Sequence, residues 1–270
     1  MRERLWLHVV SHLRLYRRSR IVLGVGLVII GIWSLAMLPM FFGGTASARF
    51  TQLQQLSAQL SGLGWMLSAA LGLYVTSTHL RNRSVQVILT RPGSPQVWLG
   101  SVFVSALLVA VALQAFGALV TFLLSILWDV PYQVGFAYLA IDAVFEAAII
   151  IAMLTTLGAV FHPVVALLLA LLFSEGTFFA LRYGADLLTA QGEGGWLVRI
   201  GRPLVIAIHT LLPMVDPFAA QTAEVGRAMR VSGADWAYLL ATAAYSLAVT
   251  AVCFLLADAA LRRRSFATTT

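Results

Sequence analysis

The stretch that decides the fold runs from Val97 to Trp128 and reads VWLGSVFVSALLVAVALQAFGALVTFLLSILW, without one charged residue. About 20 apolar residues in a helix span the hydrocarbon core of a bilayer, which is about 30 Å thick. A helix of this length can cross a membrane and either tilt or protrude from it. We therefore expect an integral membrane protein built from helices.

The composition of the whole chain supports this class. Hydrophobic residues make up 60% of the 270 positions, charged residues make up 11%, and the mean hydropathy is +0.88. A soluble domain carries roughly 25% charged residues. So much apolar surface requires lipid as its solvent.

Five further apolar runs are long enough to cross the bilayer. They are Ile21 to Phe42, Ser61 to Leu80, Val134 to Phe161, Pro163 to Leu188, and Trp236 to Leu261. We predict an all-α integral membrane protein with six transmembrane helices, forming a single domain over residues 1–270. The second run is rich in small residues, which let helices approach closely: Gly62, Gly64, Ala69, Ala70 and Gly72. Asp129-Val130-Pro131 is typical of an outer turn, and the single cysteine, Cys253, is typical of a packing residue.

One long interruption separates the fifth and sixth runs, over residues 189–235. Its apolar stretch from Pro203 to Met214 is too short to cross a bilayer. We predict helices that enter the outer side of the membrane and return. The glycines and Trp196 in this region could also dock an extracytoplasmic accessory protein.

Arginine placement orients the predicted bundle. All 18 basic residues are arginine, and twelve of them precede the first run, separate the second from the third, or follow the last. Positive residues close to span ends mark the cytoplasmic side, so both termini are expected there, in the bacterial cytoplasmic (inner) membrane. Because the arginines cluster at span ends, the net charge of +7 does not indicate nucleic-acid binding.

Residues 1–20 have the pattern of an amphipathic interfacial helix. One face carries Leu5, Trp6, Val9, Val10, Leu13 and Tyr16, and the other carries Arg4, His8, Ser11, Arg14 and Arg18. We expect the apolar face in the acyl region and the arginines at the headgroups. The alternative is a basic tail that only sets the topology.

The cytoplasmic segment 81–96 is too polar for the membrane and too apolar for a free loop. Val85, Ile88 and Leu89 can share one face of a short helix, which the turn Arg91-Pro92-Gly93 would end. A short helix that exposes apolar side chains to the cytosol indicates a partner.

This segment resembles one in the permease subunits of ABC-2 type ATP-binding-cassette exporters. The similar residues are Val85-Gln86-Val87-Ile88-Leu89-Thr90-Arg91-Pro92-Gly93-Ser94 and then Trp98-Leu99-Gly100. Pro95 and Ser101 stand where the family has arginine and lysine, and the acidic residue usual near Arg81–Arg83 is absent. The layout is also similar along the whole chain: an elbow helix, six spans, a tight turn at Phe161-His162-Pro163, and re-entrant outer helices.

The resemblance implies a homodimer of permease subunits coupled to separate ATP-binding-cassette subunits. Arg83, Val85, Ile88, Leu89 and Arg91 would then belong to the coupling helix that the ATPase moves. This chain has no lysine and therefore no phosphate-binding loop of the G-x-x-x-x-G-K-[ST] type. ATP and Mg²⁺ would be bound by the partner, so we expect no enzyme activity and no cofactor in this chain.

Four ionisable residues lie inside the predicted spans. Asp142 and Glu146 are four residues apart, and Arg182 follows Glu175 by seven, so each pair can share a helix face. Charges at this depth face the bundle interior or a partner. They could line a translocation path or form a proton-sensitive pair. Alternatively, they could be an interhelical Glu–Arg pair or protonated carboxyls bonded to a neighbouring span.

A second class of function uses the same carboxylates. A stand-alone secondary transporter or an intramembrane enzyme could perform proton chemistry with them. The five histidines (His8, His12, His79, His162 and His209) show no paired spacing typical of a metal site, so no bound metal is expected.

Overall fold

The structure is a computed structural model that describes residues 2–18, 45–81, 95–172 and 217–267, with isolated positions at 24, 26–28, 31, 34, 200, 201 and 203. Within these residues every regular element is a helix, which confirms the predicted all-α class. The helices are α1 (Arg2–Arg18), α3 (Ala46–Arg81), α5 (Pro95–Leu127), α6 (Val134–Val160), α7 (Pro163–Leu172), α10 (Ala219–Ala228) and α11 (Gly233–Ala267).

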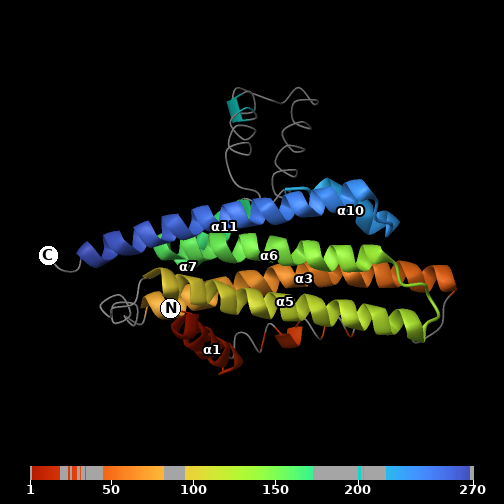
Figure 1. Cartoon of the computed structure of the whole chain (residues 1–270), viewed down its shortest axis with the longest axis horizontal. Coiled ribbons are helices and arrows are strands. Elements are labelled where there is room, and N and C mark those ends of the chain that lie inside the picture. The colour runs from red at the N-terminus through yellow and green to blue at the C-terminus, as the bar shows by residue number, and fades with distance from the viewer. Residues whose placement is uncertain are drawn as a thin grey trace.

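The four long helices α3, α5, α6 and α11 lie side by side and run along the length of the molecule (Figure 1). α6 contacts each of the other three and also α7 and α10. α1 packs on the beginning of α5, near the last turns of α11, and α10 lies at the opposite end of the bundle (Figure 1). We call these two ends the α1 end and the α10 end.

Three helices are long and apolar enough to cross a membrane, namely Gln96–Leu127, Val134–Val160 and Gly233–Arg262. They coincide with the predicted third, fourth and sixth spans. In its most apolar window α6 is 67% buried within the protein, against 22% for α5 and 28% for α11. α6 therefore forms the centre, while α5 and α11 expose apolar side chains as lipid-facing helices do. These helices fit an integral membrane protein.

The predicted second span lies within α3, a continuous helix of 36 residues, and its crossing of the membrane remains a prediction. Its small residues serve close packing, as predicted, at two positions. A Cβ at Gly64 would collide with the amide of Gln114 on α5, and one at Gly72 would lie 3.2 Å from the Cβ of Leu154 on α6. The predicted first span, the second half of the fifth, and most of the long interruption lie outside the described residues. Six crossings therefore remain a prediction.

Two predicted turns are confirmed. Between α5 and α6 the chain reverses at Asp129, which adopts a left-handed backbone with φ of 53°. Arg49 of α3 donates from Nη1 to the carbonyl of Trp128 at 3.3 Å, so a cation satisfies an acceptor at the negative end of α5. Between α6 and α7 only Phe161 and His162 intervene.

The core of α6 consists of aliphatic side chains, of which Ile149, Ile151 and Leu154 have no exposed surface. Cys253 of α11 is buried against this helix, which confirms its predicted packing role. The hydroxyl of Thr156 on α6 lies 2.9 Å from both the carbonyl of Cys253 and that of Ala152, so its single hydrogen is shared between α11 and its own helix. In a membrane, such packing and interhelical hydrogen bonds hold helices together, because lipid is as apolar as the side chains.

Candidate functional site

Asp142 and Glu146 lie one turn apart on α6, as the spacing predicts. Asp142 is 3% exposed, and Glu146 is partly exposed. The carboxylate oxygen Oδ2 of Asp142 accepts a hydrogen bond from the hydroxyl of Thr222 on α10, at 2.8 Å. A carboxyl group inside an apolar helix needs such a partner to offset its loss of water. The partner lies on the short helix α10 and not on a neighbouring span, and a role of Asp142 in a translocation path remains a prediction.

α10 is held at this end of the bundle by backbone groups at its C-terminus. Gln54 of α3 donates its amide to the carbonyls of Gly226 and Arg227, at 2.5 and 2.7 Å. Met229 ends the helix in a left-handed conformation with φ of 53°, and its carbonyl accepts from the backbone N–H of Gly135 on α6 at 3.2 Å. Carbonyls that a helix end leaves without partners are thereby satisfied by two other helices.

A third connection joins α10 to the first turn of α11. Ser232 and Asp235 form a capping box: the Asp235 carboxylate accepts from the Ser232 N–H at 2.6 Å, and the Ser232 hydroxyl accepts from the Asp235 N–H at 3.3 Å. The other carboxylate oxygen of Asp235 accepts from the Gln221 amide of α10 at 2.6 Å. The junction of α10 with α3, α6 and α11 therefore combines partly buried polar contacts with the apolar packing of Val225 and Met229.

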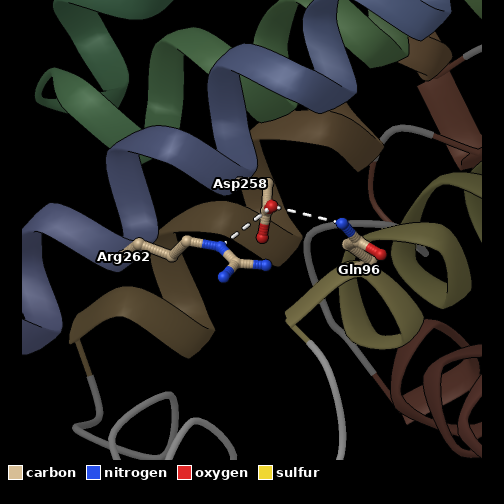
Figure 2. Close-up of polar contacts among 3 residues, drawn as sticks. All are labelled: Gln96, Asp258 and Arg262. Carbon is tan, nitrogen blue, oxygen red and sulfur yellow. Dashed lines mark hydrogen bonds and ion pairs between the residues drawn. The ribbon is translucent and has the colours of Figure 1, made fainter.

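At the α1 end, Asp258 of α11 bridges to the first turn of α5. Its Oδ2 accepts from Nε of Arg262 at 3.0 Å and from the side-chain amide of Gln96 at 3.3 Å, as Figure 2 shows. Arg262 lies one turn after Asp258 on α11, so the two form an ion pair within the helix. Arg262 is 57% exposed, so the ion pair alone contributes about 0.3–0.5 kcal/mol. Gln96 is the last residue of the predicted coupling region 81–96, so the bridge connects α11 to the end of that region.

α1 is attached to α5 by two buried hydrogen bonds. Nε2 of His12 lies 3.2 Å from the hydroxyl of Ser101, and the hydroxyl of Tyr16 lies 3.2 Å from that of Ser105. Each serine hydroxyl already donates its single hydrogen to a carbonyl one turn earlier, of Trp98 or Val102. This geometry favours His12 Nε2 and the Tyr16 hydroxyl as the donors. Burial raises the pKa of Tyr16, which keeps the phenol protonated as this bond requires.

The exposure of its side chains shows which residues of α1 lie against the bundle. Val9 and Tyr16 are buried against the bundle, and Leu5 and Leu13 are partly buried, but Trp6 from the same predicted face is 57% exposed. His12, which the pattern placed on neither face, is 4% exposed. Contact with α5 takes up part of the predicted apolar face, since Leu5 lies beside Gly100 and the hydroxyls of Ser101 and Ser105 bond His12 and Tyr16; the placement of this face in lipid remains a prediction. The sequence contains a sign of this contact. Ser101 and Ser105 are four residues apart on α5, and so are their partners His12 and Tyr16 on α1.

The remaining predicted site residues lie outside the described residues. These are the coupling residues Arg83, Val85, Ile88, Leu89 and Arg91, and the path residues Glu175 and Arg182. A small polar cavity lies between α3, α5 and α6, and its lining includes Ser57, Gln114 and Thr121. Over the parts of the chain that the structure covers, no three His, Cys, Asp or Glu side chains meet as a metal site.

No protein-family model matches the sequence, and no curated protein matches it. The function is therefore inferred from the residues and contacts described above.

Proposed function

We propose that this chain is the permease subunit of an ABC-2 type exporter. In this proposal two copies form a homodimer in the bacterial cytoplasmic membrane, with six spans each and both termini in the cytoplasm. Separate ATP-binding-cassette subunits bind ATP and Mg²⁺, and their closure drives alternating access. The chain itself holds no cofactor and catalyses no reaction.

The observation that carries the proposal is the attachment of the N-terminal helix to the start of α5. α1 packs on α5, whose first two residues are the end of the segment 81–96, in which Val85, Ile88 and Leu89 resemble a coupling helix. Gln96 joins the same place to α11 through Asp258. Movement of this segment by an ATPase would therefore be transmitted to both α1 and α11. Coupling of ATP hydrolysis to transport requires such transmission.

The experiment that tests the proposal is co-purification in a mild detergent or nanodisc. An affinity-tagged full chain, expressed with its neighbouring genes, is expected to retain a subunit with a phosphate-binding loop. A matched variant with Val85, Ile88 and Leu89 changed to Asp should lose this subunit while eluting at the size of the assembled permease dimer. Transport or substrate turnover by the purified chain alone would contradict the proposal.

A second candidate is a stand-alone secondary transporter or intramembrane enzyme. The burial of Asp142 in an apolar helix, with Glu146 one turn away, favours this candidate. Its discriminating result is uptake or release in proteoliposomes driven by a pH gradient without ATP. The Asp142→Asn variant should abolish that activity if the candidate is correct.

A further inference from the structure

The outward side of α1 combines apolar and basic residues. With Val9, His12 and Tyr16 turned toward α5, the helix exposes Trp6 by 57% and Leu7 by 70% in its first half. Its last turns expose Arg14, Arg17 and Arg18. We call these five residues, with the partly buried Val10, the outer face of α1.

The three arginines stand on one side of the helix. The spacings from Arg14 to Arg17 and Arg18 are i, i+3 and i, i+4, which bring side chains together over one turn. Within the described residues, none of the three forms an ion pair. A compact cluster of exposed guanidinium groups attracts anions, and guanidinium binds phosphate through two parallel hydrogen bonds.

The position of the outer face indicates that the phosphate belongs to a lipid headgroup. α1 is fixed by Ser101 and Ser105, which lie in the second and third turns of a helix long enough to cross a membrane. At this level Trp6 and Leu7 can enter the boundary between headgroups and acyl chains, while the arginines meet the headgroups. In the orientation expected from the sequence, the whole apolar side of α1 lies in lipid. That orientation does not separate an apolar first half from basic last turns.

We infer that the outer face of α1 binds anionic phospholipid, with Trp6 and Leu7 inserted beside the acyl chains and Arg14, Arg17 and Arg18 on the headgroup phosphates. This inference rests on the interfacial placement of α1 in the proposed function and deepens it by naming the lipid class. An anionic surface attracts each nearby arginine with a free energy that corresponds to about a fivefold change in affinity.

The test is a titration of the detergent-solubilised full chain with phosphatidylglycerol and with phosphatidylcholine, followed by native mass spectrometry. The wild type is expected to bind phosphatidylglycerol at least about tenfold more tightly. Changing Arg14, Arg17 and Arg18 to Gln should remove this preference. The matched control changes Arg227 and Arg230, which are exposed at the α10 end, to Gln and should keep it.

Three outcomes overturn the inference: equal affinity of the wild type for both lipids, an unchanged preference in the α1 variant, or an equal loss in the α10-end control. The last would show that only the total charge matters. The titration uses no ATPase, so a failed co-purification would refute the proposed function and leave the lipid result standing.

Discussion

The phenol of Tyr16 on α1 donates a buried hydrogen bond to the hydroxyl oxygen of Ser105 on α5, 3.2 Å away. The direction is fixed because the Ser105 hydroxyl gives its hydrogen to the carbonyl of Val102 at 2.8 Å. Tyr16 is therefore the donor and Ser105 the acceptor. Substitutions of these two residues should destabilise the docking of α1 by different amounts.

The Ser105→Ala substitution should destabilise the docking of α1 more than Tyr16→Phe. Removal of the serine leaves a buried phenol hydrogen without an acceptor, which costs about 1–3 kcal/mol, whereas Tyr16→Phe loses a single bond of about 1 kcal/mol. Hydrogen exchange of the α1 amides measures both effects. The double variant should resemble Tyr16→Phe, and equal costs for the two single variants would contradict the assigned direction.

The same bond predicts an effect of alkaline pH. Burial raises the pKa of Tyr16 above its ordinary value of 10.0, so the folded protein favours the neutral phenol. The contribution of this bond is fully present below pH 10 and decreases as the pH rises toward the raised pKa. Above pH 10, the α1 amides of the wild type should therefore exchange faster than the intrinsic increase of the exchange rate with pH would give. The Tyr16→Phe variant should lack this extra increase.

The close approach of Gly135 to α10 gives a third prediction. A Cβ at this position would lie 2.6 Å from the carbonyl oxygen of Met229 and 2.7 Å from its Cα, and backbone cannot move aside cheaply. Gly135→Ala should therefore lower the free energy of unfolding by about 1–3 kcal/mol and weaken the contact of α10 with α6. Thermal unfolding in detergent measures this loss. Gly233→Ala is the control, because a Cβ there meets nothing within 4 Å, and it should be neutral.

The sequence predicts the helices well because their signal is local. Apolar length alone places α5, α6 and α11, and turn residues such as Asp129 and Pro163 place their ends. Gly64 and Gly72 also follow from the rule that small residues mark close helix contacts. These features depend on composition and spacing within one segment.

The polar contacts between helices could not be predicted, because each depends on two distant segments. Thr222 and Gln54 carry no pattern that assigns them to Asp142 and to the end of α10. The contact of α1 with α5 could not be predicted for the same reason, since it depends on the small residues Gly100, Ser101 and Ser105 of a distant segment. Ser232 and Asp235 are an exception, because a capping box is local and could have been recognised.

Thr222 and Asp142 give a fourth prediction, which separates a structural from a transport role. Thr222→Val removes the donor and leaves the buried carboxylate of Asp142 without this bond, so it should destabilise the protein by about 1–3 kcal/mol. Asp142→Asn keeps a group of the same shape and, in a structural role, should preserve both folding and transport. If Asp142→Asn folds normally but abolishes transport in vesicles, Asp142 belongs to the path.

The central claim, that this chain is a permease moved by a separate ATPase, is tested most directly by ATP hydrolysis in the reconstituted complex. The wild-type chain is expected to stimulate the partner subunit, and replacement of Val85, Ile88 and Leu89 by Asp should abolish the stimulation. Chain variants at the exposed residues Arg227 and Arg230 serve as controls and should stimulate normally. Unchanged hydrolysis with and without the wild-type chain would contradict the account.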